Sequence, residues 1–473
     1  MFRLESGGTR VSGRRYWYPQ LEQLDRKELL GVQWVKLRSQ LEHLWVTNPF
    51  HRERLRAAGV NSPDDIASLD AFRELVPFSV KADHIADQDA APPYGTRLGV
   101  DVSQLATHCL TAGTSGKGQE VYGFTRLDLE LTASDTAQLF HWAGLESGDR
   151  LLGLTPVGYN LAGWATIFAS EKAGLVCYMV DPLTSPARVA FMRRFTPDGL
   201  FLTTPSHLTR LSVLAKEAGL VPARDLPNLK AVLISGENFP IPWAEAMEQF
   251  WGCAVKETYG AMPYGFTSAV CEEPVYRSDT ERGCMHLGEH TVLVEVLRPG
   301  TNEHVEAGER GELVVTQLHR EASPVLRYRS ADSAVYLGAD ACPCGRPSAC
   351  IESGTIGRYD DMMKIRANNI WPMTVDDIVL SHPAVAEYRG RVYLNDAGKD
   401  DVVIIVALQP EYRGRPEEER VAVLAELGRF LKDGTNLTMR IEEVPELPEF
   451  EYKARRWTDD RQATMTDLAT RSH

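Results

Sequence analysis

The sequence is poor in the features that direct a chain to a membrane or to nucleic acid. Residues 1–15 contain four arginines but no apolar segment typical of a secretory signal, so a cytoplasmic protein is expected. The uncharged run at 151–170 has the length of a membrane span, but Pro156, Gly158 and Gly163 interrupt it, which favours buried interior. The net charge of -14 argues against a general affinity for nucleic acid or anionic membrane. Neither is expected as a partner.

A polar, glycine-rich stretch at 110–118 is the strongest local signal. It combines three glycines, three hydroxyl side chains and one lysine within nine residues. Backbone N–H groups and hydroxyls in such a loop can surround an anion while the lysine neutralises its charge, which is the chemistry of phosphate binding. The spacing does not fit the nucleoside-triphosphatase loop, because only Thr114 and Ser115 separate the first glycine from the Gly-Lys pair. An ordinary glycine-rich turn is the alternative.

The order of strand and helix patterns predicts an α/β protein with a large first domain. At 473 residues the chain is long enough for more than one hydrophobic core. Apolar strand candidates alternate with helical stretches, which indicates a largely parallel sheet; they lie at 151–155, 175–180, 199–203 and 231–234. Alternating patterns over 291–316 favour a small β subdomain.

A polar segment at 357–361 has the character of a hinge. Beyond it, a strand pattern at 402–408 and a helical pattern at 417–432 indicate a small α+β module of about a hundred residues. We therefore expect an N-terminal domain at 1–359 and a small, mobile C-terminal domain at 360–473.

The eight cysteines favour reduced thiols or a metal site over a disulfide framework. Five of them lie close in sequence, at Cys271, Cys284, Cys342, Cys344 and Cys350, with a histidine at position 286. A Cys-x-Cys pair cannot complete a tetrahedron alone, so a metal here needs two further ligands from elsewhere in the fold. Buried free thiols are the alternative.

Several segments together resemble, in order, the core motifs of the adenylate-forming acyl-activating enzymes. These segments are Thr111–Gly118, Ser235-Gly236-Glu237, Thr258-Tyr259-Gly260, Gly308–Thr316, Leu326–Asp332, Gly357–Asp361 and Lys453. Within that superfamily the chain is most similar to the phenylacetate-CoA ligase branch, through Asn48-Pro49-Phe50, Cys342–Arg346 and Ile370-Trp371-Pro372. The likeness covers roughly residues 30–460 and depends on the order and spacing of the motifs.

The resemblance implies a two-step reaction that uses ATP and Mg²⁺. A carboxylate attacks the α-phosphate of ATP and releases pyrophosphate, and the acyl-adenylate then passes its acyl group to a nucleophile. The transition state carries spread negative charge, which suits Thr114 and Lys117 as catalytic groups at the phosphates. Lys453 resembles the lysine that bridges the carboxylate and the α-phosphate, although Tyr452 stands where the family has glycine. A solvated surface lysine is the alternative for that position.

The resemblance also implies which residues bind the nucleotide. Asp332 matches the aspartate that accepts hydrogen bonds from the ribose hydroxyls, and Asp360 lies at the hinge position. The full set that the likeness assigns to the nucleotide is Thr111, Gly113, Ser115, Gly116, Ser235, Gly236, Glu237, Thr258, Tyr259, Gly260, Asp332 and Arg358.

The acyl pocket is expected between the turn at 158–161 and the loop at 235–237, where aromatic and small residues mix. The substrate-binding residues expected there are Tyr159, Asn160, Gly236 and Ala261. An aryl or arylalkyl acid fits there, as the family resemblance implies. The branch resemblance further implies a structural Zn²⁺ held by Cys342 and Cys344 with Cys271 and His286, and with Cys284 as the competing ligand.

Two departures from the family bear on the acceptor. Pro263 stands where the family has a glutamate that helps to hold Mg²⁺, which leaves phosphate oxygens, water and Glu257 or Glu237 for the metal. Ala367 replaces a glycine that lies near the incoming pantetheine arm. Coenzyme A is the expected acceptor, and an amine or a carrier protein in a specialised biosynthetic pathway is the alternative. A non-catalytic nucleotide- or acyl-binding protein is a second alternative, and a homodimer is left open.

Overall fold

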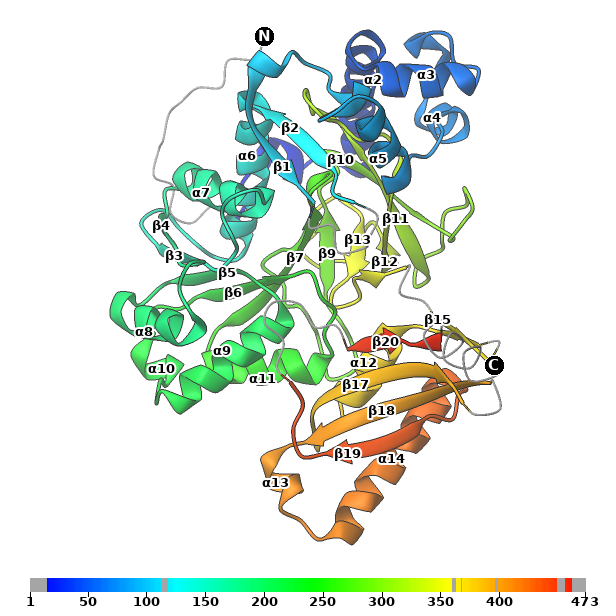
Figure 1. Ribbon diagram of the computed structural model, residues 1–473. Helices are drawn as coiled ribbons and strands as arrows, with labels where there is room; N and C mark the ends of the chain where they lie inside the picture. Colours follow the sequence, from blue (N-terminus) through cyan, green and yellow to red (C-terminus); the bar gives the residue numbers. More distant parts are fainter. Residues whose placement is uncertain are drawn as a thin grey trace. The chain divides into compact units, whose positions relative to one another are not determined.

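The computed structural model describes residues 15–111, 118–359, 363–366, 368–395, 399–448 and 456–461 (Figure 1). Contacts divide the chain into two compact units. Unit 1 comprises residues up to 203, 211–236 and 248–356, and unit 2 comprises 204–210, 237–247 and the residues from 357 onward. The predicted boundary between 359 and 360 stays a prediction, because residues 360–362 lie outside the described residues.

Of the helices up to residue 251, the first five precede the first strand, and the others alternate along the chain with strands. The α-helices are α1 (Pro19–Glu22), α2 (Arg26–Thr47), α3 (Pro49–Ala57), α4 (Leu69–Leu75), α5 (Lys81–Ala90), α6 (Arg126–Trp142), α7 (Leu161–Ala173), α8 (Ser185–Phe195), α9 (Pro205–Glu217), α10 (Pro222–Asp225) and α11 (Ile241–Trp251). Short 3₁₀ turns occur at Pro63–Asp65, Gly95–Arg97 and Val102–Gln104.

Helix starts follow local sequence signals. Asp25 begins α2 with a capping box: its carboxylate accepts from the Glu28 N–H at 2.8 Å, and Glu28 accepts from the Asp25 N–H at 2.9 Å. Asn48 caps α3 by accepting from the N–H of His51 at 3.1 Å, with Pro49 in the first turn. The Asn48-Pro49-Phe50 motif therefore serves a helix start.

The strands of unit 1 form one long mixed sheet and one hairpin. Their bounds are β1 (Leu105–Leu110), β2 (Val121–Thr125), β3 (Arg150–Gly153), β4 (Val176–Met179), β5 (Gly199–Thr203), β6 (Ala231–Ser235), β7 (Ala254–Ala261), β8 (Gly265–Val270), β9 (Cys284–Leu287), β10 (Val292–Leu297), β11 (Arg310–Gln317), β12 (Tyr328–Gly338) and β13 (Cys350–Glu352). The order across the sheet is β10-β11-β12-β13-β9-β8-β7-β6-β5-β3-β4, and β1 pairs with β2 separately.

Neighbouring strands pair in parallel over the part of the sheet that runs β4-β3-β5-β6-β7. Over the other part, β7-β8-β9-β13-β12-β11-β10, neighbouring strands pair antiparallel. The first four residues of β6 are apolar and buried, as expected for a strand covered on both faces. The predicted α/β class is confirmed. The β-rich region predicted at 291–316 is present as β10 and β11. These strands form one end of the long sheet and are connected to its parallel strands through β12, β13, β9 and β8.

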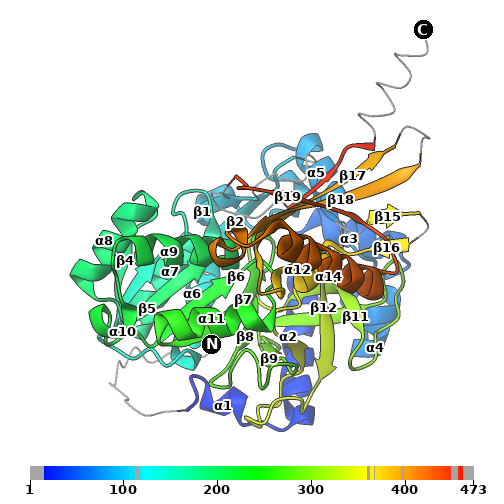
Figure 2. The same cartoon turned by 90° about the horizontal axis from the view of Figure 1, so that it is seen from below.

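Unit 2 has its own sheet and core. Its elements from residue 357 onward are β14 (Gly357–Arg358), β15 (Met363–Ile365), β16 (Asn368–Ile370), α12 (Pro372–Leu380), β17 (Val385–Leu394), β18 (Asp400–Leu408), α13 (Pro410–Arg413), α14 (Glu417–Thr435), β19 (Arg440–Val444) and β20 (Trp457–Asp459). The strand order is β19-β18-β17-β20. Helices α12 and α14 contact each other and the sheet, and Figure 2 shows them side by side. Both predicted elements, the strand at 402–408 and the helix at 417–432, are present.

Within the described ranges, none of the helices is both long enough and apolar enough for a membrane crossing. The run at 151–170 forms β3, a connecting turn and most of α7.

Candidate active site and metal centre

The carboxyl ends of β6 and β7 bring several predicted residues to one edge of the sheet. Ser235 ends β6 and pairs with Thr258 of β7. Gly236 follows with a φ of 82°, a conformation that favours glycine. A Cβ on Gly260 would lie 2.5 Å from the carbonyl oxygen of Gly265, so only glycine fits there. Loops at the carboxyl ends of parallel strands are the usual ligand sites of such sheets.

Tyr259 connects this edge to Asp332 on β12. The Tyr259 hydroxyl donates to the Asp332 carboxylate at 2.7 Å, and the ring is buried. Tyr264 joins them, with its hydroxyl 2.6 Å from that of Tyr259 and 3.3 Å from Asp332. Burial and the neighbouring carboxylate raise the pKa of Tyr259 well above its usual value, so it remains a donor. Tyr264 was not predicted, although an aromatic residue just after the Tyr-Gly motif is visible in the sequence.

The base of the glycine-rich stretch is held by hydrogen bonds between its two ends. The Thr111 N–H donates to the Glu120 carbonyl oxygen at 3.0 Å, and the Glu120 N–H donates to the Thr111 hydroxyl at 2.9 Å. Residues 112–117, which include the predicted Gly113, Thr114, Ser115, Gly116 and Lys117, lie outside the described residues.

A buried carboxylate anchors that base to distant parts of unit 1. Glu120 accepts from the hydroxyls of Tyr122 at 2.8 Å and Tyr328 at 3.3 Å, and its carboxylate lies 3.1 Å from Nδ1 of His84. Burial lowers the pKa of His84, so its imidazole is neutral beside the carboxylate. Since Tyr328 belongs to the same motif as Asp332, this network links the predicted phosphate loop to the predicted ribose site.

The remaining predicted residues have varied surroundings. Asn160 accepts from the Ala162 N–H at 2.9 Å and so caps α7, while the Tyr159 side chain is 59% exposed. Glu237 accepts from the hydroxyl of Ser206 at 2.6 Å, within unit 2. Arg358 lies exposed in β14 of unit 2, and Ala261 ends β7. Lys453 and Asp360 lie outside the described residues.

Glu257 lies on β7, two residues before Tyr259, and one of its carboxylate oxygens, Oε2, is hydrogen-bonded within the protein. Its carboxylate accepts from the Ser353 hydroxyl and the Gly354 N–H, both at 2.6 Å. The side chain is buried, and burial raises its pKa to about 7 against the opposing effect of these donors. Glu257 therefore anchors the turn after β13 and does not fit a Mg²⁺ ligand.

Replacing Glu257 by Gln should reduce the dependence of stability on pH. The folded protein keeps a proton on Glu257 up to about pH 7, whereas the unfolded chain releases it near 4.5. The unfolding free energy of the wild type should therefore fall, relative to Glu257→Gln, as pH rises through this range, by up to about 1.4 kcal/mol per pH unit. Urea unfolding of both proteins between about pH 5 and 8 measures the difference, and parallel profiles would contradict the assignment.

Four predicted metal ligands come together in the interior of unit 1. One ligand atom from each of Cys271, His286, Cys342 and Cys344 lies within 4.8 Å of the others, and all four residues are buried. The Sγ atoms of Cys271 and Cys342 are 3.7 Å apart, and Cys344 Sγ is 3.2 Å from Nε2 of His286. A tetrahedral zinc site with Zn–S bonds of about 2.3 Å has edges of roughly 3.8 Å, so the donor set and spacing fit Zn²⁺.

The neighbouring side chains also suit a metal site. Nδ1 of His286 lies 2.9 Å from the Ser348 hydroxyl, which fixes the ring with Nε2 toward the sulfur atoms. Cys284 is not part of the group; its Sγ accepts from Arg277 at 3.1 Å.

The metal group and Tyr259 lie on opposite faces of the sheet. Tyr259 pairs with Ser268, and His286 pairs with Ala269, the next residue along β8. Because consecutive strand residues point to opposite faces, the cysteine and histidine side chains point away from the nucleotide edge. The arrangement suits a structural metal rather than a catalytic one.

The comparisons with known proteins agree with this fold. A family model described as AMP-binding enzyme matches residues 54–319. The chain is 28% identical to a phenylacetate-coenzyme A ligase of Thermus thermophilus over 444 residues, 91% of this chain and 95% of that protein. A 2-hydroxyisobutyryl-CoA ligase with 2-HIB-AMP in the postadenylation state superposes with a TM-score of 0.87 at 24% identity, covering 100% of this chain and 98% of that one. The same ligase with 2-HIB-AMP and CoA gives 0.70 at 23% identity, with the same coverage.

Proposed function

The chain belongs to the AMP-binding enzyme family, and from this premise we propose that it activates a carboxylic acid as an acyl-adenylate and transfers the acyl group to coenzyme A. The observation that carries the proposal is the hydrogen bond from Tyr259, near the carboxyl end of β7, to Asp332 of β12. The Asp332 carboxylate, held by a tyrosine hydroxyl, suits the two hydroxyl donors of a ribose. Ser235, Gly236 and Thr258 border the same edge.

The proposed substrate is an aryl or arylalkyl acid. The proposal is supported by the phenylacetate-coenzyme A ligase relatives and by the mixed aromatic and small residues near this edge. Tyr159, Asn160, Gly236 and Ala261 are its proposed contacts. Asn160 contributes there mainly through the start of α7 that it caps.

Acid-dependent release of pyrophosphate tests the activation step. Purified protein with ATP, Mg²⁺ and a panel of aromatic and arylalkyl acids should release pyrophosphate with at least one acid and none without acid. Tight ATP binding with no acid-dependent pyrophosphate across the panel would instead support a non-catalytic nucleotide-binding protein.

We propose that Mg²⁺ reaches this site through phosphate oxygens and water. Pro263 offers no side-chain oxygen, and Glu257 is committed to Ser353 and Gly354. An amine or a carrier protein is the second candidate acceptor, because Pro263 and Ala367 differ from the residues that the family has at these positions.

A structural zinc ion is our second proposal, held by Cys271, His286, Cys342 and Cys344. Support comes from the spacing of the four ligand atoms and from the hydrogen bond that orients His286. Bound zinc would fix β8 and β9 to the 342–344 turn, and it has no step in the proposed reaction.

Replacing Tyr264 by Phe should weaken ATP binding more than acid binding. The change removes a hydroxyl that contacts both Tyr259 and Asp332, a loss of about 0.5–1.5 kcal/mol, and should raise KM for ATP by about 2- to 10-fold. Steady-state kinetics with each substrate varied in turn measures it. Tyr276→Phe, which removes a hydroxyl bonded to Glu248, is the matched control. Equal rises in both KM values would contradict this role.

A further inference from the structure

The segment Arg15–Glu22, here called the strap, lies against the metal group and links two distant parts of unit 1. We propose that Glu22 is a positioning residue for the metal centre: through Arg346 it holds the Cys342–Arg346 turn, so that strap docking and metal binding support each other. The inference rests on the proposed zinc site and on no feature of the proposed reaction.

The buried carboxylate of Glu22 accepts several hydrogen bonds, both from within the strap and from distant residues of unit 1. Glu22 accepts from Nε of Arg346 at 2.8 Å and from the Trp142 indole at 3.0 Å. It also accepts from the backbone N–H groups of Trp17 and Tyr18 at 2.8 and 2.7 Å. The Glu22 and Arg346 side chains are only 5% and 1% exposed, so this ion pair is almost entirely shielded from water.

Arg346 connects Glu22 to the chain beside the metal ligands through hydrogen bonds. Its backbone N–H lies 3.5 Å from Sγ of Cys344, and its Nη1 donates to Glu272, the residue after Cys271, at 2.6 Å. Its Nη2 donates to the carbonyl oxygen of Arg15 at 3.1 Å. Arg15 in turn donates to Glu272 and to the carbonyl oxygen of Cys344. The strap thus contacts the chain beside two of the four ligands.

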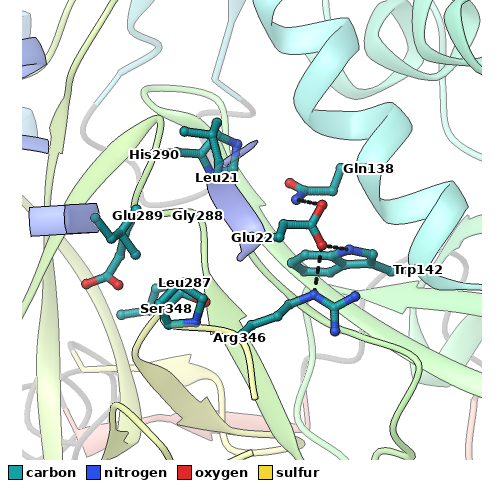
Figure 3. A pocket seen from close by; sticks show the side chains of 12 residues that line it. Leu21, Glu22, Gln138, Trp142, Leu287, Gly288, Glu289, His290, Arg346 and Ser348 are labelled. Carbon is teal, nitrogen blue, oxygen red and sulfur yellow. Dashed lines mark hydrogen bonds and ion pairs between the residues drawn. The ribbon is translucent and has the colours of Figure 1, made fainter. Parts of the chain in front are cut away.

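Two strap residues, Leu21 and Glu22, also line a small cavity beside the third ligand. Figure 3 shows Glu22 with its bonds to Arg346, Trp142 and Gln138, and Ser348 on the same cavity. Ser348 is the residue that holds Nδ1 of His286. The cavity measures about 20 Å³, room for about one water and far below the several hundred Å³ of a substrate pocket. The strap is therefore packed directly on the groups that orient the ligands.

This arrangement predicts a coupling that acts in both directions. Residues that hold metal ligands in place commonly change metal affinity by about 10- to 100-fold when replaced. If the docked strap favours metal binding, bound metal must favour strap docking by the same factor.

Zinc release from Glu22→Gln is the first test. The variant keeps the shape of Glu22 but removes the charge that faces Arg346, and it should lose zinc to a coloured chelator about 10- to 100-fold faster than the wild type. Glu295→Gln is the matched control, because it breaks the Arg327–Glu295 pair, whose side chains are each 1% exposed, away from the metal group. Equal release from all three proteins would overturn the proposal.

Hydrogen exchange on the wild type is the second test, and it needs no variant to fold. Removing zinc with a chelator should raise exchange in the peptide spanning residues 16–25, and restoring zinc should reverse it. Unchanged exchange there, with raised exchange at 342–350, would overturn the coupling while leaving the zinc site standing. A wild type that takes up no zinc would overturn both, and the acid-activation assay would be unaffected by either result.

Discussion

Replacing Lys453 by Ala should slow adenylation by about 100-fold or more and largely spare the use of a preformed acyl-adenylate. The family resemblance places this lysine between the acid carboxylate and the α-phosphate, where negative charge develops in the transition state. A loss of that size equals about 2.7 kcal/mol of transition-state stabilisation. The resemblance assigns this lysine to the adenylation step alone, so the use of a preformed adenylate should proceed.

Two separate assays distinguish this role from a general loss of structure. Pyrophosphate release measures adenylation, and thioester formation from added acyl-adenylate measures transfer. Lys432→Ala is a suitable control, since Lys432 is an exposed lysine on α14 of unit 2 and should leave both rates unchanged. An equal loss in both half-reactions would remove Lys453 from its assigned role.

Cys344→Ser should reduce bound zinc from about one equivalent per chain to near none and lower the temperature of unfolding. The thiolate is one of four donors, and three donors without it cannot complete a structural tetrahedron. The loss should be felt through the hydrophobic core of unit 1, since Cys271, Cys342 and Cys344 all belong to it. Elemental analysis and thermal unfolding provide the two readouts.

Cys284→Ser provides the control for the ligand set. Cys284 is buried in the same core, but its sulfur accepts from Arg277 instead of joining the four ligand atoms. This variant should retain zinc. Zinc kept by Cys344→Ser, or lost equally from both variants, would show that the ligand set is wrong.

Much of the fold was predictable because its signals are local. The apolar strand at 231–234 and the alternation of strands and helices specify a parallel α/β sheet from neighbouring residues alone. Whether the strands at 291–316 form a separate subdomain was less predictable. Their antiparallel pattern looks the same in a separate sheet and at the end of a longer one, and here they belong to the long sheet.

Some residues of the candidate site could also be predicted from the sequence, and others could not. Motif residues such as Ser235, Thr258 and Tyr259 could be found from the resemblance to the family's core motifs, and the structure brings them to one edge. The choice of Cys271 over Cys284 could not be made from spacing alone. It follows from the tertiary fold, which brings the Cys271 sulfur to the other three ligand atoms, while the Cys284 sulfur accepts from Arg277.

The contacts that the sequence did not reveal join residues far apart in the chain. Glu22 and Arg346 are separated by 324 positions, and His84 and Glu120 by 36. No periodicity or motif relates such pairs, because only the tertiary fold brings them together. These buried networks lie at Glu120, beside the base of the predicted loop, and at Arg346 of the Cys342–Arg346 turn, and only the fold could reveal them.

In the proposed reaction this chain activates an acid as its adenylate and delivers the acyl group to coenzyme A. Its most direct test follows pyrophosphate and thioester together in one reaction with ATP, a cognate acid and coenzyme A. One thioester should form for each pyrophosphate, at the same rate. Pyrophosphate release with accumulated adenylate and no thioester, relieved by adding an amine, would contradict it.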